Sequence, residues 1–180
     1  MPSLAVKVLL LKTTFRILGI DPGTRVVGVG VIEVGGAHPT FVHCEAIEPK
    51  KTAPVSDRLL YIHNELERIL DREKPNIVVI EQVYVGKSSP SAIRIGEGRG
   101  IALLCAARIG AEIHEYPPAT VKRAIAGFGG ADKEQVATWI SRLLQLTEPP
   151  RPYDAADALA LALTHAHRQR SPIENLRFTK

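Results

Sequence analysis

The chain has 180 residues, of which 45% are hydrophobic and 23% charged, with a formal net charge of +4 and a pI of about 9.2. This composition predicts one ordinary globular domain with a sizeable core, and no repeat or low-complexity tract interrupts it. The excess of basic residues is compatible with a polyanionic partner, and no apolar run is long enough to span a membrane.

Three strands open the predicted fold. Apolar runs at residues 16–20, 26–33 and about 40–47 are separated by a Pro-Gly turn and a Gly-Gly turn. Short turns of this kind join neighbouring antiparallel strands, so we expect a meander.

An amphipathic helix follows, from residue 55 to about residue 70, and Ser56 or Asp57 is expected to cap it. Its apolar stripe recurs at helical spacing and consists of Val55, Leu59, Ile62, Leu66, Ile69 and Leu70. The segment "NIVVIEQ", residues 76–82, is apolar throughout, as in a strand that is covered on both faces. Residues 84–90 are expected to form a loop.

The rest of the chain alternates helices with one strand. We expect helices at residues 91–109, about 119–126, 133–146 and 154–168, with a strand at residues 112–116. Strands separated by crossover helices run parallel in one sheet.

The order of elements predicts a single α/β domain at residues 16–168. Its sheet is expected to have five strands, antiparallel for strands 1–3 and parallel for strands 1, 4 and 5, with helices on its flanks. Residues 1–15 are interpreted as an N-terminal extension, which could be floppy, an extra edge segment or an artefact of the start site, and residues 169–180 as a disordered tail. Cys44 and Cys105 are interpreted as buried free thiols, which indicates a reducing, cytoplasmic setting.

Four acids stand where this topology could gather them. Asp21 and Glu81 end the first and fourth strands, and the carboxyl ends of parallel strands meet at one edge of a sheet. Asp154 and Asp157 open the last helix and, three residues apart, share one face of it. Each acid also has a plain structural interpretation, as a turn residue, a strand end or a helix N-terminal acid.

Several carboxylates in one place need raised pKa values or cations. Two of them ~5 Å apart repel by roughly 3 kcal/mol at an effective dielectric of ~20. Oxygen ligands without a nearby His or Cys cluster suit Mg²⁺ or Mn²⁺, and two such ions can promote hydrolysis of a phosphodiester. The acids therefore predict a metal site that acts on phosphate.

Three motifs in order, "LGIDPGTRVVGVGV", "VIEQVYVGK" with a downstream "GEGRG", and "DAADALALALTHAH", resemble the RuvC family of Holliday-junction resolvases. The resemblance implies a ribonuclease H-like fold and homodimeric, Mg²⁺-dependent cleavage of four-way DNA junctions in recombination and repair, leaving a 5′-phosphate and a 3′-hydroxyl. It assigns the roles of catalytic residue and metal ligand to Asp21, Glu81, Asp154 and Asp157. It also implies two Mg²⁺ ions per subunit, with Mn²⁺ as a substitute, and a branch-migration motor as partner.

Several further residues are candidates for DNA contacts. Tyr84 would stack on an unpaired base, and Lys122 and Lys133, which flank a glycine loop, would lie near the scissile phosphate, as the resemblance implies. The weaker candidates for backbone contacts are Lys87, Arg94, Arg99 and Arg123. The plain alternatives are a loop-anchoring aromatic ring and solvated surface cations.

Small residues in the 91–109 helix leave two interpretations open. Ala92, Gly96 and Gly100 are spaced by four, so this face could accommodate a second subunit or pack within the monomer. Trp139 is expected in the core. Two rival functions remain: an actin-like or sugar-kinase-type ATPase, since "GIDPGT" also resembles the phosphate loop of those enzymes, and a non-catalytic DNA-binding module of the same fold.

Overall fold

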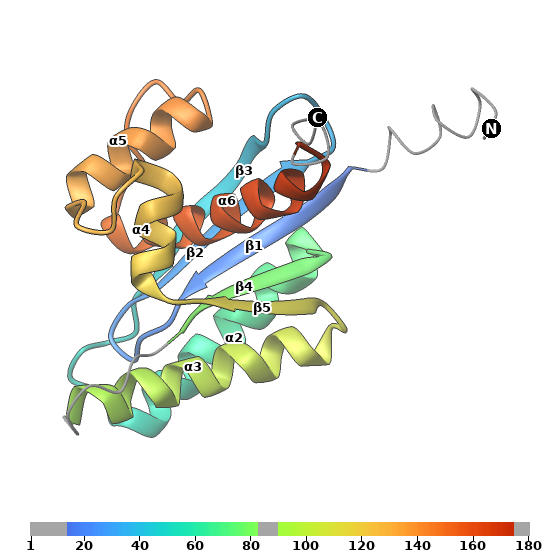
Figure 1. The fold of residues 1–180 in the computed structure, drawn as a ribbon. Coiled ribbons are helices and arrows are strands. Elements are labelled where there is room, and N and C mark those ends of the chain that lie inside the picture. The colour runs from blue at the N-terminus through green and yellow to red at the C-terminus, as the bar shows by residue number, and fades with distance from the viewer. Residues whose placement is uncertain (1–13, 83–89, 175–180) are drawn as a thin grey trace.

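The computed structural model describes residues 14–82 and 90–174, which form one five-stranded sheet with helices on both faces (Figure 1). The strand order is β3-β2-β1-β4-β5. β1 pairs antiparallel with β2 and parallel with β4, β2 pairs antiparallel with β3, and β4 pairs parallel with β5. The predicted mixed sheet is therefore confirmed; its strands are β1 (Phe15–Asp21), β2 (Val27–Val34), β3 (Thr40–Ile47), β4 (Ile77–Glu81) and β5 (Glu112–Tyr116).

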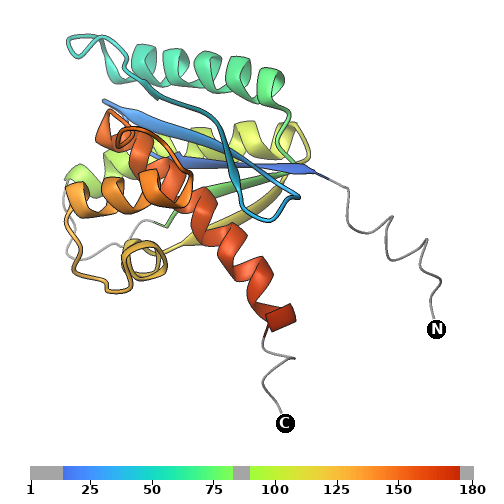
Figure 2. The ribbon, with the colours of Figure 1, turned by 90° about the horizontal axis from the view of Figure 1, so that it is seen from above.

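Two layers of helices enclose the sheet (Figures 1 and 2). One apolar cluster joins the sheet to α2 (Val55–Glu73) and α3 (Pro90–Arg108). The other joins it to α4 (Pro118–Ala126), α5 (Lys133–Leu143) and α6 (Tyr153–Glu174). None of the helices in the described part of the chain is long and apolar enough to cross a membrane.

The alternation of side chains along the strands decides which layer each acid faces. In β1, Ile17 belongs to the α4–α6 cluster, whereas Leu18 and Ile20 belong to the α2–α3 cluster. Successive side chains of a strand point to opposite faces, so Asp21 lies on the α4–α6 side. In β4, Ile80 faces α2 and α3, and Glu81 therefore also lies on the α4–α6 side.

Three glycines let α6 lie directly on the sheet. A Cβ atom at Gly19 would come 1.9 Å from the Ala158 carbonyl oxygen, and one at Gly28 would come 1.9 Å from that of Asp154. A Cβ at Gly30 would come 2.6 Å from the Leu159 nitrogen. Only hydrogen fits at these positions, so the height and register of α6 over β1 and β2 are fixed by backbone contact.

A fourth glycine brings α3 against the turn that follows Asp21. A Cβ at Gly98 would lie 2.3 Å from the Gly23 carbonyl oxygen, so the helix and this turn touch through their backbones. In contrast, a Cβ at Gly96 or Gly100 would meet no atom within 4 Å. Packing within the monomer therefore does not explain Gly96 and Gly100.

Several details of the helices differ from the sequence-based expectations. Neither Ser56 nor Asp57 caps α2, because the N-cap is Pro54 and makes no side-chain hydrogen bond. α5 ends at Leu143, three residues early, and Gln145 just beyond it has a left-handed φ of 54°. α6 runs on to Glu174, six residues past its predicted end.

The expectations for Trp139 and Cys44 were also wrong in part. Trp139 is 40% exposed, because the apolar stripe of α5 is centred on Val136 and Ile140. The Arg142 guanidinium lies over the indole ring, 5.1 Å from the ring centroid. Cys44 and Cys105 are both free, as predicted, but only Cys105 is buried. Cys44 lies on the edge strand β3, where one side of the backbone is open.

Candidate active site

A pocket of about 330 Å³ opens where the carboxyl ends of β1 and β4 meet α4, α5 and α6. Its walls hold three carboxylates, two lysines and four apolar residues. They are Asp21, Glu81, Asp157, Lys122, Lys133, Pro118, Val121, Val136 and Ala160. Residues more than a hundred positions apart in the sequence thus line one concave surface.

Strand register places Asp21 next to Glu81. Ile20 of β1 pairs with Ile80 of β4 in the parallel ladder, and both acids are the next residues on their strands. Neighbouring strands are about 4.8 Å apart, so the two side chains leave the sheet side by side on the same face.

The backbone contact of α6 brings the other two acids to the same place. Asp21 pairs with Gly28 across the β1–β2 ladder, and the Asp154 carbonyl lies directly over Gly28. Asp157 lies one helical turn further on and lines the pocket. Asp154 is not among the pocket's lining residues, but its charge acts on Asp21. The predicted convergence of the four acids is therefore present in the structure.

The acids perturb one another strongly. Burial, together with the charges of Glu81, Asp157 and Asp154, raises the pKa of Asp21 to about 8. Burial also raises the pKa values of Glu81 and Asp157. At neutral pH and without a cation, Asp21 is mostly protonated, because a further negative charge in this pocket is unfavourable.

Lys133 is the nearest counter-charge. Its Nζ lies 3.1 Å from the Asp157 carboxylate, and the lysine acts to lower the pKa values of Asp21, Glu81 and Asp157. A capping box holds the start of α5: Asp132 accepts a 2.8 Å hydrogen bond from the Gln135 amide, and the Gln135 side chain accepts a 3.0 Å bond from the Asp132 amide. This fixed N-terminus directs Lys133 toward the acids.

The donor set of the pocket fits a hard divalent cation. Carboxylate oxygens are the ligands preferred by Mg²⁺ and Mn²⁺, and no His or Cys is among the described lining residues. The oxygens of Asp21, Glu81 and Asp157 do not all lie within 4.8 Å of one another. Rotation of these side chains would therefore have to close the ligand set around an ion.

A second group of potential ligands has a structural explanation. His63, Glu67 and Cys105 place one ligand atom each within 4.8 Å of the others, between α2 and α3. Burial raises the pKa of the Cys105 thiol to about 11, and Arg108 forms an ion pair with Glu67. A protonated thiol and a neutralised carboxylate do not favour a cation there.

The predicted DNA-binding residues are divided between different places. Lys122 and Lys133 line the pocket with the acids. Arg99 forms an ion pair with Glu115 at 2.5 Å, and Arg123 is exposed on α4. Arg94 lines a different pocket, beside the turn after Asp21. Tyr84 and Lys87 lie outside the described residues.

Sequence reasoning missed the glycines that position α6. Gly28 and Gly30 alternate along β2, and glycine within a strand often marks a close backbone approach. The pattern "GVGV" is visible in the sequence, and it indicates that a helix lies close against the face of β2 on which the two glycines stand.

Comparison with known proteins gives one consistent result. The model of the family "Crossover junction endodeoxyribonuclease RuvC" matches residues 17–165. Curated proteins of that name are similar: the one from Afipia carboxidovorans is 43% identical over 162 residues, covering 90% of this chain and 94% of that protein, and the one from Chloroflexus aurantiacus is 42% identical over 152 residues, covering 84% and 93%.

Solved structures agree in fold. Thermus thermophilus RuvC in complex with a Holliday junction substrate has a TM-score of 0.80 and 36% identity, covering 88% of this chain and 96% of that chain. The yeast mitochondrial Holliday junction resolvase Ydc2 has a TM-score of 0.64 at 13% identity, covering 93% and 86%, and this likeness concerns the fold alone.

Proposed function

The chain belongs to the RuvC family of crossover junction endodeoxyribonucleases, and from that premise we propose how its residues resolve four-way DNA junctions. It is a nuclease of the ribonuclease H-like fold that acts on Holliday junctions. The observation that carries the assignment of its site is the meeting of Asp21, Glu81 and Asp157 with two lysines in one pocket.

The four acids serve as the metal ligands. RuvC-family nucleases depend on metal ions, and we assign Mg²⁺, two per subunit, with Mn²⁺ as a substitute. Asp21 and Glu81 would hold one ion, and Asp21 with Asp154 or Asp157 the other. When bound, the ions supply Lewis acidity for in-line attack of water on phosphorus and for departure of the 3′ oxygen. The products are a 5′-phosphate and a 3′-hydroxyl that a ligase can seal.

The two lysines hold the phosphate that is cut. Lys122 and Lys133 line the pocket together with the strand-end acids, and each donates from a flexible ammonium group. Lys133 also neutralises Asp157 at 3.1 Å. With Asp157 engaged as a metal ligand, Lys133 would be free to contact the phosphate.

Paired nicks on opposed strands require two sites, and a homodimer is the simplest source. The exposed face of α3 suits such an interface, because Gly96 and Gly100 have open space above them, and Ile93 and Leu104 are 67% and 52% exposed. Apolar side chains beside small residues permit close approach of a second helix.

Further assignments rest on the resemblance of the motifs. Tyr84 would stack on an unpaired base near the junction centre, and Lys87, Arg94, Arg99 and Arg123 would contact the DNA backbone. A branch-migration motor would deliver the junction, and the enzyme would work in the cytoplasm.

The rival functions have less support. An ATPase of the actin or sugar-kinase type leaves Asp154 and Asp157 without a role. A non-catalytic module of the same fold leaves the four intact acids, three of which line one pocket, without a role. Turnover of ATP with Mg²⁺ but without DNA would favour the first rival.

The proposed function is tested on a mobile synthetic four-way junction. Purified protein is incubated with the junction in Mg²⁺, Mn²⁺ or EDTA, and the nicks are mapped on all four strands. We expect symmetric nicks that ligase can seal, in both metals and not in EDTA. Asymmetric cuts, or cutting that persists in EDTA, would contradict the assignment.

A further inference from the structure

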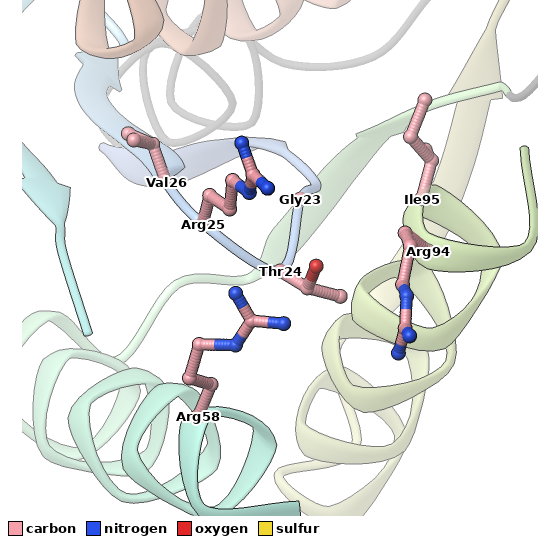
Figure 3. A pocket seen from close by; sticks show the side chains of 7 residues that line it. All are labelled: Gly23, Thr24, Arg25, Val26, Arg58, Arg94 and Ile95. Carbon is pink, nitrogen blue, oxygen red and sulfur yellow. The ribbon is translucent and has the colours of Figure 1, made fainter. Parts of the chain in front are cut away.

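A second pocket, of about 570 Å³, lies on the other side of the turn that follows Asp21 (Figure 3). Gly23, Thr24 and Arg25 of this turn form one wall, α2 contributes Arg58, and α3 contributes Arg94. It adjoins the α2–α3 layer, whereas Asp21 faces the α4–α6 layer. The two pockets share no lining residue, but the turn that lines the second pocket follows directly after Asp21, which lines the first.

Arg58 is the unusual member of this pocket. It is only 8% exposed, its Nε has no hydrogen-bond partner, and no described carboxylate forms an ion pair with it. Figure 3 shows its guanidinium pointing from α2 toward Thr24. A permanent positive charge that is buried without a partner is costly, and its place in the first turn of α2 adds the positive end of the helix dipole.

The surrounding groups add positive charge and a hydrogen-bond donor. Arg25 is exposed and makes no side-chain hydrogen bond or ion pair with the described residues, whereas Arg94 forms an ion pair with Glu97 at 3.2 Å. Thr24 is 5% exposed, and its hydroxyl makes no hydrogen bond with the described part of the chain. No acidic residue is among the described lining residues. Arg94 is paired with Glu97, but Arg25 and Arg58 have no carboxylate partner among the described residues, and two such guanidinium groups beside one hollow are suited to bind an anion.

We propose that this pocket binds a backbone phosphate of the junction DNA other than the phosphate that is cut. Guanidinium groups match phosphate geometrically, and bonds between these charged partners are among the strongest hydrogen bonds in proteins. Arg58 and Thr24 would bind the phosphate at the base of the pocket, with Arg25 and Arg94 closing from the rim. The inference rests on the proposed function, because it takes the ligand to be the same DNA.

Chain geometry sets how far the second phosphate can be from the first. Asp21 and Arg25 are four residues apart, so their Cα atoms are at most about 14 Å apart. A DNA strand carries a phosphate about every 3.4 Å along its axis. The second phosphate should therefore lie within about four nucleotides of the cut, and its capture would fix the DNA against the turn that carries Asp21.

The variants Arg58→Met and Arg25→Gln test this proposal. Each should weaken junction binding about 3–10-fold at 0.1 M salt and reduce the salt slope of binding by about 0.9, which corresponds to one lost phosphate contact. Because the Arg58 charge is unpaired, the melting temperature of Arg58→Met should equal or exceed that of the wild type. Arg68→Gln is the matched control, since Arg68 lies on the same helix but is paired with Glu65 at 2.8 Å.

A scan of the DNA locates the contact. Single neutral methylphosphonate linkages are placed at each position within four nucleotides of the cut, and binding is measured in EDTA. Wild type should lose affinity at one position besides the cut, and Arg58→Met should be indifferent to that position only. Inorganic phosphate, compared with chloride at equal ionic strength, should raise the melting temperature of wild type more than that of Arg58→Met.

Different results would contradict the proposed function and the second phosphate site. A wild type that neither binds nor nicks the junction would contradict the proposed function itself. Normal nicking by wild type, with Arg58→Met and Arg25→Gln equal to it in affinity and salt slope, would overturn only the second phosphate site. A phosphate-dependent melting shift without any sensitive linkage would also overturn it, since the ligand would then be free phosphate. Arg25→Gln decides the matter if Arg58→Met fails to fold, because Arg25 is exposed.

Discussion

Replacing Asp21 by asparagine should abolish junction cleavage while making the metal-free protein more stable. Burial and three neighbouring acids raise the pKa of Asp21 from 3.8 to about 8. A carboxyl whose pKa is raised on folding binds a proton more tightly in the native state. Its contribution to stability is therefore present at low pH and is lost as the pH rises from about 4 through 8.

The size of the effect follows from the pKa shift. Each pKa unit corresponds to about 1.4 kcal/mol, so the raised pKa of Asp21 lowers the stability of the native state relative to the unfolded state, in which this carboxyl ionises freely, by up to about 2 kcal/mol at pH 5 and about 5 kcal/mol at pH 8. Asparagine carries no charge at any pH. The stability gained by Asp21→Asn should thus grow by about 4 kcal/mol, as an upper limit, between pH 5 and pH 8.

Urea unfolding of wild type and Asp21→Asn in EDTA, at pH 5 and at pH 8, measures this difference. Added Mg²⁺ should reverse the order, because it stabilises only the protein with its full set of ligands. A gel shift should show nearly unchanged junction binding by the variant, and a cleavage assay should show no nicks.

Two results would refute the reasoning. If the stability difference between the proteins did not depend on pH, Asp21 would not have the raised pKa on which the electrostatic argument rests. If Asp21→Asn nicked the junction at the wild-type rate, Asp21 would not be a ligand of the catalytic metal.

Three further predictions concern other parts of the molecule. Lys122→Ala and Lys133→Ala should each slow cleavage at least about tenfold and reduce the salt slope of binding by about 0.9; unchanged slopes in both variants would argue against phosphate contacts. Gly28→Ala should lower the free energy of unfolding by about 3 kcal/mol, since its Cβ would lie 1.9 Å from a carbonyl oxygen, whereas Gly100→Ala, with open space, should not. Leu104→Lys should leave the melting temperature nearly unchanged but produce monomers in sedimentation; a persistent dimer would place the interface elsewhere.

The sheet and the meeting of the acids were predictable because both follow from simple periodicities. Side chains alternate along a strand, and the ends of parallel strands share an edge, so Asp21 and Glu81 could be placed before any coordinates. Asp154 and Asp157 followed from the spacing of a helical turn. These rules depend only on backbone geometry and not on how distant side chains pack, so the positions of the four acids could be predicted from the sequence.

Features that depend on contacts between distant side chains were not predictable in the same way. The 3.1 Å ion pair between Lys133 and Asp157 depends on how α5 packs against α6. No local sequence pattern predicts that packing. The burial of Arg58 left a trace, since it lies four residues before Ile62 on the apolar stripe of α2. A charged residue on the apolar stripe of a helix indicates that an anionic partner is needed where the helix packs.

The contact between Gly98 and the Gly23 carbonyl gives the fold an unusual stiffness at one point. A side chain can absorb a displacement by changing its rotamer, but two backbones in direct contact have no such freedom. A neighbouring molecule that displaced α3 would therefore displace the turn beside Asp21 as well.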